Sequence, residues 1–111
     1  MNTEILQKYN LTIRKEIDGN CDISGDPIAT YIYIYRHKDD VREFIDDLQL
    51  AIDGQFSSIE DPDKGASLST YFFAEITPDN FQIWQRGTEK FIIPLEDFRD
   101  ILIEWHNCLS S

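Results

Sequence analysis

The clearest periodic pattern of the chain lies between residues 39 and 54. Apolar residues recur there at intervals of three and four positions, the spacing that places side chains on one face of an α-helix. Asp40 followed by Glu43 fits a capping box at the start of this helix, and Gly54 stands where a left-handed C-terminal cap is common. The predicted apolar stripe consists of Val41, Phe44, Ile45, Leu48, Ala51 and Ile52.

A second helical stripe lies near the other end of the sequence. It follows Pro94, whose fixed φ suits the first position of a helix. The segment Glu4–Tyr9 also has helical spacing, so a short helix is an alternative reading for the start of the sequence. The second stripe consists of Leu95, Phe98, Ile101, Leu102, Trp105 and Leu109.

Five segments rich in β-branched and aromatic residues predict strands. In the first of them, Leu11, Ile13 and Ile17 share one side, as in a half-buried strand. The predicted strands are Tyr9–Ile17, Ile28–Arg36, Ser69–Thr77, Phe81–Arg86 and Lys90–Ile93. Residues that favour turns dominate the segments between them, namely Asp18–Pro27, Gln55–Leu68, Thr77–Asn80 and Gly87–Glu89.

The order of these elements predicts an α+β fold in a single domain over residues 1–111. Each long helix has one apolar stripe, so both are expected to pack on one face of a mainly antiparallel sheet of about four to five strands. The other face is then either an exposed binding surface or is covered by the N-terminal segment or a long loop. The side chains expected on that face are Tyr33, Tyr35, Phe73 and Trp84.

Charge narrows the classes of ligand. The chain has 21 acidic and 10 basic residues, and its formal net charge is −11. Nucleic acids and anionic membranes bind surfaces rich in Lys and Arg, so neither is expected as a direct ligand. An acidic surface attracts a basic protein instead.

The sequence also suggests a compartment. No continuous apolar segment resembles a signal peptide, and the uncharged stretches Pro27–Tyr35 and Gly65–Ala74 are far shorter than a membrane span of roughly 20 residues. A cytoplasmic protein is therefore expected. Because the cytosol is reducing, Cys21 and Cys108 are expected to be thiols rather than a disulfide.

Catalytic and metal-binding motifs are not found in the sequence. His37 lies at a predicted strand-to-helix junction, where surface or capping roles are common. His106 and Cys108 are two positions apart on a helix and point away from each other. The Cys and His residues also lack the close spacing of a zinc site, so no enzymatic activity, metal or cofactor is expected.

The segment Glu75–Leu109 (EITPDNFQIWQRGTEKFIIPLEDFRDILIEWHNCL) resembles the closing hairpin and helix of small immunity proteins from bacterial contact-dependent growth inhibition and related polymorphic toxin systems. The segment EFIDDLQLAIDGQ adds weaker support. This resemblance implies a protein without catalytic residues that binds and neutralises a toxin domain delivered by a sibling cell. It covers about half of the chain and transfers no contact residues, because these differ between toxin pairs.

The resemblance and the charge together predict a non-enzymatic inhibitor of a cognate basic toxin domain, with RNA or DNA as the expected substrate of the toxin. Charge would steer the two proteins together, and carboxylates would occupy subsites that otherwise take phosphates. The expected contact carboxylates are Asp46, Asp47, Glu60, Asp61 and Asp63. Tyr33 and Trp84 are candidate aromatic anchors.

Three other functions stay open. An acidic nucleic-acid mimic would inhibit a defence or restriction enzyme, but Lys38, Arg42, Lys64 and Arg99 interrupt the row of carboxylates that it needs. A small enzyme would use His37 with a neighbouring carboxylate. An adaptor subunit would bind a partner other than a toxin with weak salt dependence. The oligomeric state is left open.

Overall fold

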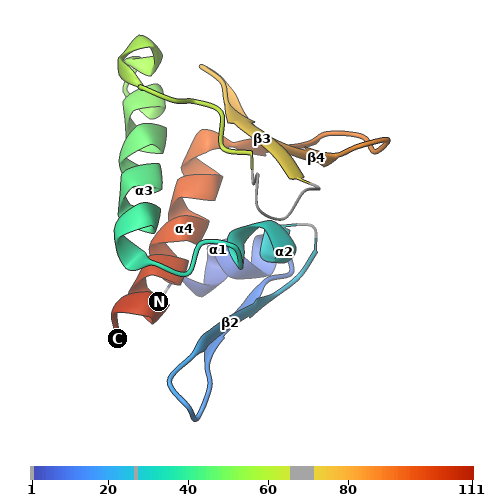
Figure 1. Ribbon diagram of the computed structural model, residues 1–111, viewed down its shortest axis with the longest axis vertical. Helices are drawn as coiled ribbons and strands as arrows, with labels where there is room; N and C mark the ends of the chain where they lie inside the picture. Colours follow the sequence, from blue (N-terminus) through green and yellow to red (C-terminus); the bar gives the residue numbers. More distant parts are fainter. Residues whose placement is uncertain (1, 27, 66–71) are drawn as a thin grey trace.

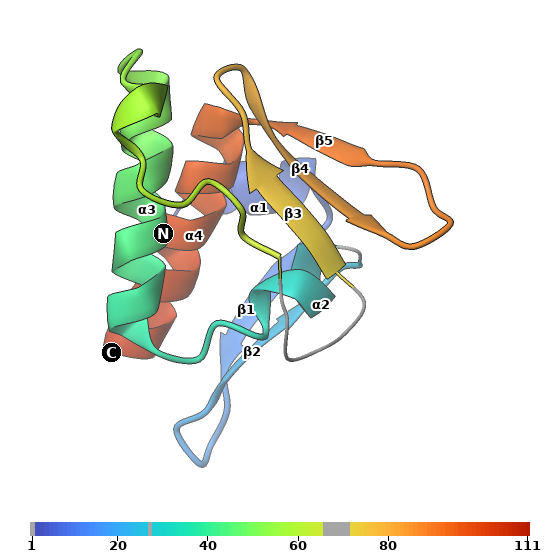
Figure 2. The ribbon, with the colours of Figure 1, turned by 45° about the horizontal axis from the view of Figure 1, so that its top comes forward.

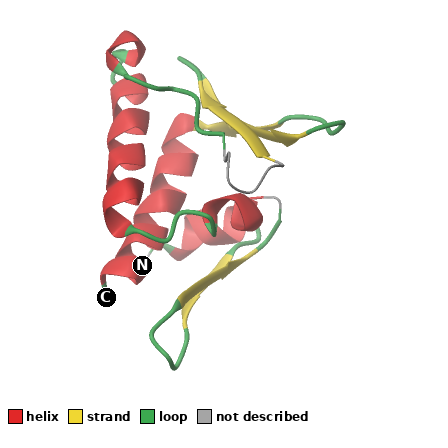
Figure 3. Ribbon diagram, in the orientation of Figure 1, coloured by secondary structure: helices red, strands yellow, loops and turns green. Residues whose placement is uncertain are grey.

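The computed structural model describes residues 2–26, 28–65 and 72–111 (Figures 1 and 3). It confirms an α+β fold, but the strands form two antiparallel sheets, β1–β2 and β3–β4–β5, so the expectation of one sheet of four to five strands is wrong. The elements in chain order are α1 (Thr3–Lys8), β1 (Thr12–Lys15), β2 (Cys21–Ser24), α2 (Ile28–Ile32), α3 (Lys38–Ile52), the 3₁₀ turn η1 (Phe56–Ser58), β3 (Phe72–Ile76), β4 (Asn80–Gln85), β5 (Phe91–Pro94) and α4 (Leu95–Ser110).

The three-stranded sheet buries one face against helices. Helices α3 and α4 lie side by side, and the sheet extends from them on one side of the molecule (Figures 1 and 2). Phe81 of β4 stacks on Phe98 of α4 with 4.1 Å between ring centres, and Phe44 of α3 lies 5.4 Å from Phe81. The inward side chains of the sheet are Phe72, Ala74, Ile76, Phe81, Ile83 and Ile93, all buried.

Both long helices confirm their predicted stripes. Helix α3 begins at Lys38, two residues before the proposed capping box. Asp39 and Asp40 therefore lie in its first turn, where their negative charges interact favourably with the positive end of the helix dipole. The expected capping box is therefore wrong, and no side-chain cap bond forms at His37. Gly54 has φ +78° after the last turn, as the C-terminal signal predicted.

The segment Ile28–Arg36 is not a strand, and its prediction is wrong. Its first five residues form the short helix α2, in which Ile28, Ala29, Tyr31 and Ile32 are all buried. Burial at these spacings suits one face of a helix, and this packing outweighs the strand propensity of β-branched and aromatic residues. Tyr31 thereby enters the centre of the core with its ring fully buried.

The N-terminal hairpin corrects two further boundaries. The short helix at the start is confirmed as α1, whereas only Thr12–Lys15 of the predicted first strand is extended and Ile17 is fully exposed. The expected loop Asp18–Pro27 contains strand β2, whose Cys21 and Ile23 alternate with more exposed neighbours. The strand has only four residues, and the Gly, Asp and Asn residues around it favour turns, so the local pattern indicates a loop. The expected extended residues 69–71 and loop residues 66–68 lie outside the described residues.

The two cysteines form a disulfide, which corrects the expectation of free thiols. The bond joins Cys21 of β2 to Cys108 near the end of α4, with 6.1 Å between their Cα atoms. The hairpin packs against the last turns of α4, and this contact brings together two residues that are 87 positions apart. No helix within the described ranges is long and apolar enough to cross a bilayer.

Tyr9 and Lys8 connect the end of α1 to the start of α4. The Tyr9 hydroxyl donates to Asp97 Oδ2 at 2.5 Å, and Lys8 Nζ donates to the same oxygen at 2.9 Å. Partial burial alone raises the pKa of Asp97, but the hydrogen bonds from Tyr9 and Lys8 outweigh it and hold the pKa below its ordinary value. The ionised form of Asp97 therefore stabilises the fold.

We expect Tyr9→Phe to lower the free energy of unfolding by about 1–2 kcal/mol at neutral pH, because Asp97 loses a hydrogen bond to its charged form. Since the pKa of Asp97 is lower in the folded state, this stabilisation is complete above its unfolded value of about 3.9 and is lost as pH falls through the folded-state pKa. Urea unfolding across this acid range should show the difference between the two proteins shrinking. Tyr33→Phe is the matched control, and a pH-independent loss in Tyr9→Phe would contradict the assignment.

Candidate functional site

The acidic loop, residues 60–64, lies along the edge of strand β3. The amide of Lys64 donates to the carbonyl of Ala74 at 2.8 Å, and the amide of Ile76 donates to the carbonyl of Pro62 at 2.9 Å. Asp63 and Glu75 form a β-bridge between these two bonds. The loop is therefore held to the sheet through its backbone. Its carboxylate side chains take no part in this pairing, and their orientation is set by hydrogen bonds within the loop.

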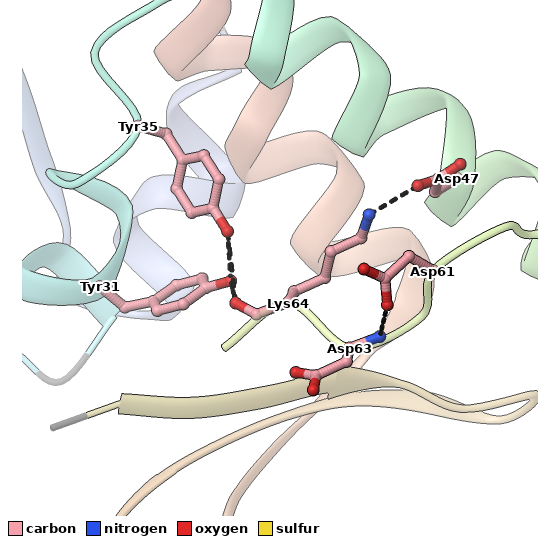
Figure 4. Close-up of polar contacts among 6 residues, drawn as sticks. All are labelled: Tyr31, Tyr35, Asp47, Asp61, Asp63 and Lys64. Atoms are coloured by element: carbon pink, nitrogen blue, oxygen red, sulfur yellow. Dashed lines mark hydrogen bonds and ion pairs between the residues drawn. The ribbon is translucent and has the colours of Figure 1, made fainter. Parts of the chain in front are cut away.

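Lys64 connects this loop to two helices (Figure 4). Its carbonyl accepts hydrogen bonds from the hydroxyls of Tyr31 at 2.6 Å and Tyr35 at 3.3 Å. Its ammonium donates to Asp47 Oδ2 on α3 at 2.7 Å, and both side chains are largely buried. Burial raises the pKa of both tyrosine hydroxyls, so they stay protonated and act as donors near neutral pH.

The structure brings three of the predicted carboxylates around Lys64. Asp47 pairs with its ammonium, and Asp61 and Asp63 lie in the loop beside it (Figure 4). Asp61 accepts the amide of Asp63 at 3.1 Å, and Asp63 accepts the amide of Gly65 at 2.9 Å. These backbone bonds fix the carboxylates without neutralising them.

The other two predicted carboxylates are exposed. Asp46 lies on the exposed side of α3. Its side chain is 66% accessible, and its Oδ1 lies 4.0 Å from Nη1 of Arg42. Glu60 begins the acidic loop and is also exposed. We call the five predicted carboxylates, Asp46, Asp47, Glu60, Asp61 and Asp63, the acidic face.

Tyr33 lies in a different environment from the one predicted for it. It follows α2 rather than facing outward from a strand, and the guanidinium of Arg36 lies 4.3 Å from its ring centre. Arg36 also donates to the carbonyl of Cys21 at 2.9 Å. Tyr33 and Tyr35 are thus not on the outer face of a sheet, and that part of the prediction is wrong.

Trp84 does lie on the outer face of the three-stranded sheet, together with Phe73, as the strand pattern predicted. The two rings stack with 5.6 Å between their centres, and Lys90 Nζ lies 4.4 Å from the centre of the Trp84 ring. Phe73 and Ile92 are exposed. We call Phe73, Glu75, Trp84, Lys90 and Ile92 the sheet patch.

Comparison with family models, curated proteins and solved structures gives no match to this chain. Function is therefore inferred from the charge and geometry of the residues themselves. Within the described parts of the chain, no group of three or more His, Cys, Asp or Glu side chains has the arrangement of a metal site.

The two histidines lie outside the acidic loop, His37 just before α3 and His106 in the second half of α4. His37 is exposed just before α3, and its neighbours Asp39 and Asp40 belong to the first turn of that helix. Partial burial lowers the pKa of His106, and the nearby charges of Arg42 and Lys38 lower it further. His106 is therefore neutral near pH 7 and adds no positive charge close to α3.

Sequence reasoning missed the organising residues of the acidic face. In the sequence, Lys64 stands only as an interruption of the negative charge, and it is the one base within the loop. Tyr31 lies in α2 and Tyr35 lies beyond its end, so no single periodicity in the sequence predicts that both hydroxyls reach the carbonyl of Lys64. The contribution of Lys90 and Ile92 to the sheet patch follows from strand alternation once the register is known.

Proposed function

We propose that this protein is a non-enzymatic immunity protein that binds a cognate toxin domain with a basic surface and blocks its active site. The acidic face carries the proposal: Asp47 of α3 and Asp61 and Asp63 of the acidic loop lie around Lys64, and backbone amides of the loop hold Asp61 and Asp63 in place. A toxin that cleaves RNA or DNA presents basic subsites for phosphates, and this region has the complementary charge.

The mechanism has an electrostatic and a short-range stage. The net charge of −11 accelerates the encounter with a basic domain. At contact, the exposed carboxylates of Asp46, Glu60 and Asp61 occupy subsites that otherwise bind phosphates. Binding is then sensitive to salt, because the contributing charges are exposed to solvent.

The compartment of action follows from the proposed target. A toxin that degrades nucleic acid acts in the cytoplasm, so the inhibitor is placed there as well. The cytosol keeps most thiols reduced. The proposal therefore requires that the protein also binds its target when Cys21 and Cys108 are thiols.

We expect the double variant Asp46→Lys/Glu60→Lys to bind the toxin domain encoded by the neighbouring upstream reading frame about 10- to 100-fold more weakly than the wild type. The loss should be concentrated in the association rate, and the salt dependence should become shallower, because exposed charges act mainly on encounter. Surface-based kinetics at two salt concentrations and growth during co-expression of the toxin domain measure both effects.

Glu16→Lys/Asp79→Lys is the matched control, since both residues are exposed and the change in net charge is the same. It should retain rescue and most of the affinity. Equal losses in the two double variants would show that net charge, rather than the acidic face, determines binding. Full rescue and unchanged affinity in Asp46→Lys/Glu60→Lys would contradict the proposed function.

A further inference from the structure

The outer face of the three-stranded sheet presents its side chains in rows. Phe73 of β3 pairs with Trp84 of β4, and continuing the β4–β5 register places Lys90 beside Trp84. In the next row Glu75 pairs with Gln82. Ile92, on the other side of Gln82, is 57% exposed, and Phe73 is 44% exposed. The face therefore combines an open apolar surface with one carboxylate and one ammonium.

Lys90 occupies a binding position for a cation on this face. Its ammonium lies 4.4 Å from the centre of the Trp84 ring and 3.9 Å from Glu75 Oε1. An aromatic face next to a carboxylate is the chemistry that holds an ammonium or guanidinium group. Lys90 precedes β5 and is 47% exposed, so its flexible side chain can move away while the strands stay paired.

We infer that the sheet patch is a receptor for an arginine or lysine side chain of the protein partner, which displaces Lys90 and stacks on Trp84. Glu75 then pairs with the incoming charge, and Phe73 and Ile92 contact the aliphatic stem. This inference deepens the proposed function, on which it rests, because it names the group that the basic partner inserts.

Charge favours such a partner over a second copy of this chain. Two copies each carry a net charge of −11 and repel one another, whereas a basic domain is attracted.

The test uses N-acetyl-arginine amide as the probe and N-acetyl-citrulline amide as its neutral isostere. In ¹H–¹⁵N NMR titrations of the full chain, the Trp84 indole and the amides around the sheet patch should shift with the arginine probe and not with citrulline. Trp84→Leu should abolish these shifts. Equal shifts with both probes, or shifts confined to the acidic face, would overturn the inference.

Lys90→Ala supplies the sharper arm. Because the internal cation no longer competes, the arginine probe should bind about two- to fivefold more tightly. Lys38→Ala removes the same charge from the exposed start of α3 and should leave the affinity at the patch unchanged. Weaker binding in Lys90→Ala, or concentration-dependent broadening of the patch signals without any probe, would overturn the inference, the latter in favour of self-association.

The two proposals can fail separately. The probe titration requires no toxin. If the patch signals do not shift with the arginine probe, the cation site is refuted, and rescue by the wild type is unaffected by this result. Conversely, probe binding without rescue or affinity for the toxin domain leaves a cation site on a protein of another function.

Discussion

Replacing Trp105 by alanine is expected to lower the free energy of unfolding by about 3–5 kcal/mol, a large part of the about 5–15 kcal/mol available to a domain of this size. The Trp105 side chain is fully buried in α4, and its indole N–H donates to the carbonyl of Tyr35 at 2.7 Å. The substitution therefore removes core contacts and also leaves a carbonyl without its donor in the segment between α2 and α3. Urea denaturation followed by circular dichroism measures the loss.

Trp84→Ala is the matched control, because it makes the same change on a partly exposed side chain of the sheet patch. Its cost should be clearly smaller than that of Trp105→Ala, since the Trp84 side chain stays partly in contact with water in the folded state. Trp105→Phe should fall between the two variants. Similar losses for the two alanine variants would contradict the assignment of Trp105 to the core and Trp84 to the surface.

Reduction of the Cys21–Cys108 disulfide is expected to destabilise the protein by about 2–4 kcal/mol. The bond closes a long loop, with 87 positions between its cysteines, so its removal gives the unfolded chain considerably more freedom. Chemical denaturation with and without dithiothreitol measures the difference. Its result bears on the cytoplasmic setting of the proposed function, where the dithiol form would predominate.

The double variant Cys21→Ser/Cys108→Ser provides the control for this experiment. It should have the stability of the reduced wild type and should not respond to dithiothreitol. Binding to a basic partner should survive reduction, because neither cysteine belongs to the acidic face or the sheet patch. A wild type with equal stability in both redox states would refute a contribution of the bond to the fold.

Local patterns predicted the elements that have one clear periodicity. The stripes of α3 and α4 are long enough for the period of 3.6 residues to be unambiguous, and the meander of β3, β4 and β5 is marked by its turns. The segment Ile28–Arg36 failed because its residues alternate as a strand does and also repeat every three to four positions. The choice was made by tertiary packing around Tyr31, which no local pattern contains.

For the candidate site, the sequence indicates only those features that depend on local charge and on strand alternation. The positions of the acidic segments and the outward orientation of Trp84 follow from the clusters of carboxylates and the strand alternation in the sequence. The disulfide and the contacts of Lys64 join residues that are distant in sequence, so they depend on how the hairpin and the loop dock onto the helices. The division of the strands into two sheets is also not visible in local patterns. Strands β1 and β2 pair their backbone hydrogen bonds with each other, so they form a sheet without the β3–β5 meander.

The hydrogen bonds that hold the backbone of Lys64 have a consequence for the thermodynamics of association. Ordering a residue of a flexible loop costs roughly 1–2 kcal/mol in backbone entropy, which a binding partner normally has to supply. Here the backbone of the loop is already held by β3 and by two tyrosine hydroxyls. The carboxylates are thus presented in a preorganised geometry, and little of the energy of complex formation is consumed in arranging them.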